Sequence, residues 1–310
     1  MLVLVVGATG VLGSATARSL LASGHSVRGM TRRAARIRDI EALGAEPVIA
    51  DLANPSSLAR ACDGADRVFA AAHGALGRGR NRSEVIDDAG HRALIDAARN
   101  ARVGRFVYTS ALGAAPDHPI DFFRTKWNIE QHLASSGMPY VVLRPSAFME
   151  WHAHAFNGAA VFKKGRAVIL GTGTKRRNFV AARDVAEVAT RALVGDMPLD
   201  RVLGVGGPGD FTNDEVTRLY ARIAGVPARI THISRAVLTV VGWIARPLHP
   251  GIARAMRLSS LPDDAFAETF DAAASNLQRE IGATTLEAFV RERVREYQAC
   301  AKTAMLRSPP

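Results

Sequence analysis

The chain opens with a run of aliphatic residues that leads directly into closely spaced glycines. Residues 2–6 read LVLVV, and Gly7, Gly10 and Gly13 follow in the stretch GATGVLG. A short unbroken apolar run of this kind is typical of a strand that is buried on both faces of a parallel sheet. Glycines at the turn that leaves such a strand, followed by a helix-like segment, predict a dinucleotide-binding β–α unit.

Each glycine has its own part in that prediction. Gly7 permits the tight turn, Gly10 lets the backbone approach a diphosphate without a Cβ, and Gly13 lets the helix pack close to the strand. The helix N-terminus offers free N–H groups and a partial positive charge to the same diphosphate. The alternative is a glycine turn that serves packing alone. The loop residues expected to bind the cofactor are Gly7, Thr9, Gly10, Val11, Leu12 and Gly13.

Strand-like and helix-like segments alternate through the first half of the chain, and short loops join them. Strands are expected at residues 2–6, 25–31, 46–52, 66–72, 105–111 and 140–146. Helices are expected at 11–23 and 33–43, in a short segment from Ser56, at 83–101 and at 122–137. This order predicts an α/β fold with a doubly wound parallel sheet of the Rossmann kind.

The pattern loosens after Pro145, although strand and helix signals return. A strand and then a helix are expected within 176–194, a strand at 201–207 and a helix at 212–225. We therefore expect a dinucleotide-binding Rossmann domain over residues 1–150 that takes back late segments at about 178–207. The rest, 151–177 and 208–310, is expected to form a smaller, mostly helical C-terminal lobe for the substrate.

The end of the second expected strand distinguishes the two nicotinamide cofactors. An NAD site usually places an acidic residue there, about 20 residues after the glycines, to hold the ribose 2′-hydroxyl. No acidic residue precedes Asp39, and the segment carries Arg28, Arg32, Arg33, Arg36 and Arg38 instead. A guanidinium suits a 2′-phosphate, so we predict NADP(H), with Arg32 and Arg33 at that phosphate. The alternative is a solvated basic helix face.

Two further strand ends are expected to border the cofactor. Asp51 and Leu52 end the third strand, where Asp51 could contact the adenine edge or simply cap the helix that follows. Ala71 and Ala72 end the fourth strand, and their small side chains leave room for a ribose.

Composition narrows the classes of partner. The formal charge is +11, yet arginine supplies 35 of the 40 basic residues and is scattered, so no nucleic-acid partner is expected. Cys62 and Cys300 lack metal or redox spacing, which favours free thiols and a cytoplasmic location. His152 and His154 have no visible third ligand, so no metal site is expected.

Membrane signals are weak in the sequence. The N-terminus reads as a first strand rather than a signal peptide. The apolar run at 236–245 is ten residues long, about half of what spans a bilayer, and is expected to be a core or interface helix. We therefore expect a small-molecule substrate and no membrane partner.

Together these residues resemble the NmrA-like group of atypical short-chain dehydrogenases/reductases over most of residues 1–225. The matching residues are GATGVLG (7–13), Arg32, DL (51–52), FVYTSALGA (106–114), FFRTKWNIEQHLASSGMPYVVLRPSAFME (122–150), NFVAARDVAEVA (178–189) and GGPGDFTNDEV (206–216). The group includes isoflavone-reductase-like and quinone-reductase-like enzymes, and also NADP(H)-binding proteins that regulate or sense without turnover.

The resemblance implies roles around the nicotinamide. It implies that Thr109 and Ser110 line the nicotinamide side, that Lys126 contacts the nicotinamide ribose, and that Pro145 and Phe148 flank the ring. Ordinary short-chain dehydrogenases carry a tyrosine four residues before this lysine, so that one helical turn brings the two side chains together.

In this chain the tyrosine position is Phe122, so the usual proton donor is missing. The candidates to replace it are Lys126 itself, Ser110 at the end of the fifth strand, Tyr108 two residues earlier, and His118 in the following loop. We favour Lys126 and Ser110 as the catalytic pair. The alternative for Lys126 is a solvated helix residue paired with Glu130.

The leading hypothesis is an NADPH-dependent reductase that moves a hydride to a small apolar carbonyl, quinone or enone-type substrate. A second hypothesis is a non-catalytic NADP(H)-binding redox sensor or regulator, which the phenylalanine at position 122 supports. A third is a membrane-peripheral assembly factor, suggested by the apolar 236–245 segment and the basic surface.

Overall fold

The computed structural model describes residues 1–263, 265, 268–270 and 280–307, with the side chains of 301–307 left out. The chain divides into two compact units. Unit 1 comprises Met1–Pro145, Ala182–Val205 and Thr239–Leu258, and unit 2 comprises Ser146–Ala181, Gly206–Leu238 and Ser259–Pro310. Residues 239–258 thus cluster with the first unit, although the sequence placed them in the C-terminal lobe.

Unit 1 is built on a seven-stranded parallel sheet with the strand order β10-β6-β5-β4-β1-β2-β3. The strands are β1 (Leu2–Val6), β2 (Ser26–Thr31), β3 (Glu46–Ile49), β4 (Arg67–Ala70), β5 (Arg105–Thr109), β6 (Tyr140–Pro145) and β10 (Arg201–Val205). From β1 the chain winds first toward β3 and then, from β4, in the opposite direction. The predicted doubly wound Rossmann sheet is therefore confirmed, including the late strand β10 that pairs with β6.

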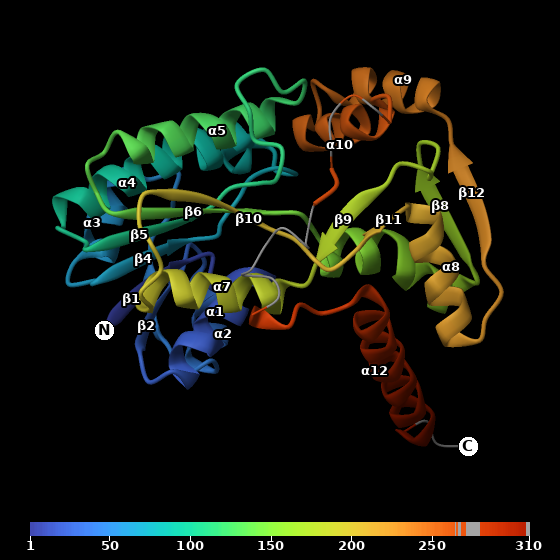
Figure 1. The fold of residues 1–310 in the computed structure, drawn as a ribbon, viewed down its shortest axis with the longest axis horizontal. Helices are drawn as coiled ribbons and strands as arrows, with labels where there is room; N and C mark the ends of the chain where they lie inside the picture. The colour runs from blue at the N-terminus through green and yellow to red at the C-terminus, as the bar shows by residue number, and fades with distance from the viewer. Residues whose placement is uncertain (264, 266–267, 271–279, 308–310) are drawn as a thin grey trace. The chain divides into compact units, whose positions relative to one another are not determined.

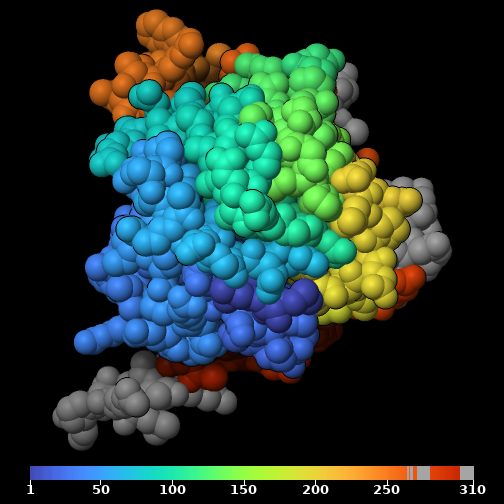
Figure 2. All heavy atoms as spheres, turned by 90° about the vertical axis from the view of Figure 1, so that its left-hand side faces the viewer, coloured from blue at the N-terminus to red at the C-terminus, as the bar shows by residue number. Residues whose placement is uncertain are grey.

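Helices cover both faces of this sheet. Figure 1 shows α3 (Pro55–Cys62), α4 (His91–Asn100) and α5 (Asp121–Ala134) on one face, and α1 (Val11–Ala22), α2 (Ile37–Glu41) and α7 (Ala182–Val194) on the other. The core between sheet and helices is aliphatic and aromatic, with Leu4, Val6, Leu94, Phe106 and Tyr108 buried. In Figure 2 the blue-to-green residues of this unit form a closely filled surface, with the yellow residues near position 200 beside the green ones.

Two helices predicted in unit 1 take a different form. The expected helix at 33–43 is a 3₁₀ turn (Ala34–Arg36) followed by the short α2, because Arg33 is extended. The expected helix at 83–101 begins as a π-helix, Glu84–Gly90, and becomes α-helical only at His91. A second short 3₁₀ turn covers Gly79–Asn81. The π-helix matters because its wider turn re-aims side chains, and such segments often mark functional sites.

Unit 2 holds two small sheets. One has the order β11-β9-β7 and the other pairs β12 with β8 in parallel. The strands are β7 (Ala147–Phe148), β8 (Arg166–Leu170), β9 (Arg177–Val180), β11 (Asp210–Phe211) and β12 (Arg229–Ile233). Neither β8 nor β12 was predicted from the sequence.

The helices of unit 2 pack around an aromatic core. They are a π-helix at Met149–Gly158, α6 (Ala159–Lys164), α8 (Asn213–Ala224) and α12 (Leu286–Arg307). Helix α8 begins with a capping box, in which Thr212 Oγ1 accepts from the Glu215 N–H and Glu215 Oε2 accepts from the Thr212 N–H. Phe179, Tyr220 and Phe289 are buried together here.

Two more helices, α9 (Arg235–Ala245) and α10 (Pro250–Ser260), follow β12 in the chain. Each is eleven residues long. Within the described residues, every helix is too short or too polar to traverse a bilayer.

Candidate functional site

The strand ends of unit 1 arrange the predicted cofactor residues in a row along the carboxyl edge of the sheet. In the order β6, β5, β4, β1, β2 and β3, the row carries Pro145, then Thr109 with Ser110, Ala71 with Ala72, the glycine loop, Arg32 with Arg33, and Asp51 with Leu52. With about 4.8 Å between neighbouring strands, the row is roughly 24 Å long. That length suits an extended dinucleotide, and the glycine loop lies at the point where the winding reverses.

The glycine loop has the geometry of a phosphate cradle. Gly7 has a φ of +92°, and a Cβ there would lie 2.9 Å from the Ala72 backbone nitrogen. A Cβ on Gly13 would lie 2.2 Å from Gly7 O, so α1 can approach the turn only with glycine at that position. Gly10 is the N-cap of α1, and the first turn from Val11 carries no acidic side chain. The first N–H groups of α1 are therefore open to an anion.

The arginines after β2 lie beside that loop. Arg32 donates from Nη1 to Asn81 Oδ1, and Arg36 donates from Nη2 to Thr9 O at 3.4 Å. Arg36 was not among the predicted site residues. A continuous helix at 33–43 did not predict that the Arg36 side chain would contact the glycine loop. Arg28, by contrast, pairs with Glu46 and donates to Asp63 O at 2.5 Å, which gives it a structural role.

The other predicted positions on this edge are small or locally engaged. Asp51 Oδ1 accepts from the Ala53 N–H at 2.9 Å, so it caps its own turn. Leu52 is buried, while Ala71 and Ala72 are half-buried. Phe148 lies on β7 and belongs to unit 2, whereas the other predicted cofactor residues belong to unit 1.

Lys126 lies on α5 and is buried. Its Nζ donates to Thr109 O at 3.0 Å and is 3.8 Å from Asp87 Oδ1. The same nitrogen is 4.8 Å from the ring centroid of Tyr108 and 5.4 Å from that of Phe122. Lys126 is therefore no solvated helix residue, and its ion pair is with Asp87 rather than with Glu130 one turn later.

Asp87 is positioned by the π-helix. Its Oδ2 accepts from Ser83 Oγ at 2.7 Å and from the Gly74 N–H at 3.0 Å, and its side chain is fully buried. Sequence reasoning missed this residue. A signal was nevertheless present, because Asp87 and His91 continue the buried face that Leu94 forms in α4 at helical spacing.

His91 and Tyr108 complete the buried cluster. His91 Nδ1 is 2.7 Å from Ile86 O, so this nitrogen carries the proton. The His91 and Tyr108 rings meet edge to face at 5.3 Å. His91 Nε2 and the Tyr108 hydroxyl have no hydrogen-bond partner among the residues that the structure describes.

Burial controls the ionisation of this cluster. It lowers the pKa of the Lys126 ammonium below its usual 10.5, against the opposing charges of Asp87 and Glu130. Burial, together with the charge of Lys126, lowers the pKa of His91 to about 4, so this imidazole is neutral near pH 7. Burial and the nearby carboxylates raise the pKa of Tyr108, which stays a phenol.

Ser110 belongs to a second polar chain. Its Oγ donates to Glu130 Oε1, and Arg144 holds the same carboxylate through Nε at 2.9 Å and Nη2 at 2.5 Å. His118, another candidate from sequence, is buried, and its Nδ1 accepts from the Ile120 N–H at 3.0 Å. The predicted pair Lys126 and Ser110 thus lies at one strand end, with each side chain engaged by a different carboxylate.

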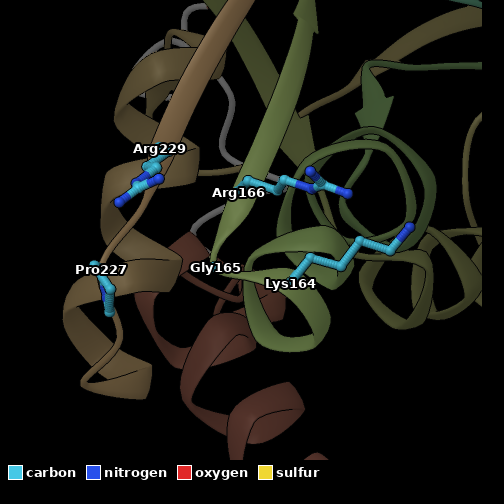
Figure 3. A pocket seen from close by; sticks show the side chains of 5 residues that line it. All are labelled: Lys164, Gly165, Arg166, Pro227 and Arg229. Carbon is cyan, nitrogen blue, oxygen red and sulfur yellow. The ribbon is translucent and has the colours of Figure 1, made fainter.

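Unit 2 contains a separate hollow of about 390 Å³ (Figure 3). Arg166 and Arg229 stand opposite each other in the β8–β12 pair at its wall. Such a cationic lining suits an anion rather than an apolar carbonyl compound, and no residue predicted for the redox site belongs to it. The residues that line the hollow are Lys164, Gly165, Arg166, Pro227 and Arg229.

The two histidines of segment 148–156 lie on the π-helix of unit 2. His154 Nδ1 is 3.3 Å from the Tyr220 hydroxyl. Among the described residues, no three His, Cys, Asp or Glu side chains are arranged to hold a metal ion.

Comparison with known proteins identifies the family. Residues 7–196 match the family described as NAD(P)H-binding. The chain is 32% identical over 235 residues to NAD(P)H azoreductase of Xenophilus azovorans, covering 75% of this chain and 77% of that protein. It is 28% identical over 246 residues to photosystem II assembly factor Ycf39 of Guillardia theta, covering 79% and 77%.

A solved structure shares the fold. The NADPH-dependent quinone oxidoreductase QOR2 of Escherichia coli, in complex with NADPH, superposes with a TM-score of 0.70 at 22% identity, covering 94% of this chain and 99% of that one. The chain therefore belongs to the NAD(P)H-binding oxidoreductase family of NmrA-like, atypical short-chain dehydrogenases/reductases.

Proposed function

We propose that this protein is an NADPH-dependent reductase of small apolar carbonyl, quinone or enone-type compounds. The observation that carries the proposal is the edge of the unit 1 sheet. There an uncapped helix N-terminus in a glycine cradle, a group of arginines and a buried lysine follow one another from strand to strand. The azoreductase relative adds support, because reduction by a nicotinamide cofactor is its named activity.

Preference for NADPH follows from the charge at the end of β2. Arg32, Arg33 and Arg36 are exposed there, and Arg36 contacts the glycine loop itself. A 2′-phosphate brings two negative charges to this position, whereas a 2′-hydroxyl would need an acceptor that these arginines do not provide.

Calorimetric titration tests this preference. Arg32→Asp is expected to weaken NADPH binding by tenfold or more, since charge-assisted hydrogen bonds contribute about 1.5–3 kcal/mol, and to leave NADH binding little changed. Arg38→Asp is a matched control, because Arg38 is also exposed on this segment and the substitution makes the same change of charge. Equal losses of NADPH and NADH affinity in Arg32→Asp would contradict the assignment.

Lys126 is the residue to which we assign the chemistry. A bound NADPH supplies the hydride, so the protein must provide a proton for the substrate oxygen. The lowered pKa of Lys126 suits proton transfer better than a solvated lysine would. Ser110 can orient the substrate oxygen if its hydroxyl exchanges Glu130 for substrate.

Stopped-flow absorbance with NADPH and a panel of quinones, enones and azo dyes tests turnover. Oxidation of NADPH by at least one compound, slowed at least 100-fold in Lys126→Met, is the expected result for a positioned acid–base group. Unchanged rates in Lys126→Met would remove the lysine from the chemistry, while the cofactor titration would still report on binding.

A non-catalytic NADP(H)-binding regulator is the second candidate. Two features support it: Phe122 occupies the turn before Lys126, and the Ser110 hydroxyl is held by Glu130. Tight NADPH binding with no oxidation across the panel would favour this function over the reductase.

A further inference from the structure

The α9–α10 hairpin presents an apolar surface to solvent. Trp243 is 77% exposed and Leu248 is 75% exposed, and Val240 and Ile244 are more than half exposed. In α9 these residues follow one another at helical spacing, so they form one face, and Leu248 extends it into the turn before α10. Ile252 and Leu76 add exposed aliphatic surface nearby. A contiguous group of this kind is unusual on a protein that has no partner for it.

The hairpin is held in place from its other side. Arg254 donates to Asp121 through Nε at 2.8 Å and Nη2 at 2.7 Å, and through Nη1 to Ala75 O at 2.6 Å. Gly251 lies so close to the Leu76 backbone that a Cβ would come within 2.4 Å of it, and a Cβ on Gly242 would touch Met256. In Figure 2 the hairpin is the orange projection next to cyan residues. The exposed face is thus presented by an anchored element, not by a loose tail.

The hairpin's own charged side chains have one sign, although Glu84 and Asp121 approach it at Arg254. Residues 239–258 contain three arginines and neither aspartate nor glutamate. Arg254 is neutralised by Asp121, whereas Arg246, in the turn between the helices, is exposed. An exposed tryptophan with aliphatic neighbours and an arginine at the end of the helix is typical of a helix that lies in a membrane interface, where lipid phosphates meet the guanidinium.

We propose that the α9–α10 hairpin docks unit 1 onto a bilayer of anionic phospholipids. Trp243, Ile244 and Leu248 enter the boundary between headgroups and acyl chains, and Arg246 contacts the phosphates. Charge complementarity selects this occupant, because an apolar partner protein or a second copy of this chain would have to supply acidic groups opposite Arg246. Docking does not depend on turnover, so it can be tested whether or not the reductase proposal holds.

Vesicle co-sedimentation of the full chain tests the proposal. The probes are vesicles of phosphatidylcholine alone and of phosphatidylcholine mixed with phosphatidylglycerol. The chain is expected to sediment with the anionic vesicles, less with the neutral ones, and less again as salt is added. A Trp127→Phe/Trp151→Phe protein leaves Trp243 as its tryptophan, and its emission is expected to shift to the blue on binding and to be quenched by brominated lipid.

Substitutions localise the effect to the hairpin. Leu248→Asp is expected to lower partitioning into anionic vesicles about tenfold or more, because an aliphatic side chain is replaced by a carboxylate that the lipid phosphates repel. Val168→Asp is the matched control, since Val168 is 52% exposed on β8 and the substitution makes the same change of charge. NADPH affinity of each variant reports that unit 1 is folded.

Three results would overturn the proposal. Wild-type protein could stay in the supernatant with both vesicle types, or Leu248→Asp could bind as the wild type does. Sedimentation velocity without lipid could instead show a dimer that Leu248→Asp dissolves, and the face would then belong to a second copy of the chain.

Discussion

Replacing Asp87 by asparagine removes the charge that faces Lys126 and keeps the shape of the side chain. The Asp87 side chain is fully buried, and that of Lys126 is 3% exposed. In Asp87→Asn the amide oxygen can still accept from Ser83 Oγ and the Gly74 N–H. The amide N–H₂ group then faces the ammonium, so Lys126 retains its hydrogen bond to Thr109 O but loses its counter-charge.

Breaking one side of a buried ion pair costs about 3–5 kcal/mol, because the remaining charge is left uncompensated. The two single variants are expected to differ. Lys126→Met leaves a carboxylate that still accepts two hydrogen bonds, whereas Asp87→Asn leaves an ammonium with one. We therefore place the cost of Asp87→Asn at the upper end of the range. The double variant should be more stable than Asp87→Asn alone, since neither charge remains.

The loss of unfolding free energy in Asp87→Asn should depend on pH if it comes from the lost charge, and should not depend on pH if it comes from packing. The folded-state pKa of Lys126 lies below 10.5, so unfolding takes up a proton between that lowered pKa and 10.5, and stability rises with pH across this window. Loss of the Asp87 charge lowers the folded-state pKa further. The free energy of unfolding of the variant therefore starts to rise at a lower pH than that of wild type. The difference in unfolding free energy between the two proteins becomes smaller as the pH increases.

Urea unfolding followed by circular dichroism, at neutral pH and at an alkaline pH below 10.5, measures both quantities. A deficit below about 1 kcal/mol at neutral pH would be no more than an average substitution costs and would refute the ion-pair argument. A large deficit that does not change with pH would also refute it, because packing alone would then explain the loss.

The glycine loop, His91 and the capping box of α8 give three further expected outcomes. Gly13→Ala should cost about 1–3 kcal/mol of stability by overpacking, since its Cβ would lie 2.2 Å from Gly7 O. In Gly10→Ala the nearest contact of the new Cβ is at 3.2 Å. This variant should therefore unfold like wild type, yet bind NADPH more weakly. The lowered pKa of His91, about 4 against 6.5, means that stability should fall as pH falls through this interval. The loss is about 3 kcal/mol at about 1.4 kcal/mol per pKa unit, and His91→Gln should remove that part of the dependence in urea unfolding. Thr212→Ala should lower the free energy of unfolding by about 1 kcal/mol through loss of the cap, measured in the same assay.

The sheet of unit 1 was predictable because its strands are coded locally. Several of the expected strands centre on short apolar segments, such as LVLVV at 2–6, VFAAA at 68–72 and YVVL at 140–143. The alternation of strands and helices predicts a parallel sheet with right-handed crossovers, whereas the strand order itself comes from the structure. Strand β12 has a weak signal, because its residues RITHI are only partly apolar and it pairs with β8 alone in a two-stranded sheet.

The alignment of the predicted cofactor residues along one sheet edge was predictable for the same reason, because most of them lie at strand ends; their role in cofactor binding stays a prediction. The partners of Lys126 were not predictable. Helical spacing indicates that Asp87 is buried, but it does not reveal the π-helical turn that brings this carboxylate to Lys126. Arg36 was missed in a similar way, since a 3₁₀ turn in place of the expected helix brings it to Thr9.

The choice of lysine at position 126 bears on its role. Two carboxylates of unit 1 are bound by arginine in paired geometry, Glu130 by Arg144 and Asp121 by Arg254. Lys126 instead faces Asp87 through a single contact at 3.8 Å. A guanidinium remains protonated in any protein environment, whereas burial shifts the pKa of an ammonium readily. An arginine could neutralise the charge of Asp87, as arginines neutralise carboxylates elsewhere in this chain. An arginine could not give up and regain a proton, whereas a lysine can. The choice of lysine at position 126 thus supports our proposal that this residue transfers a proton.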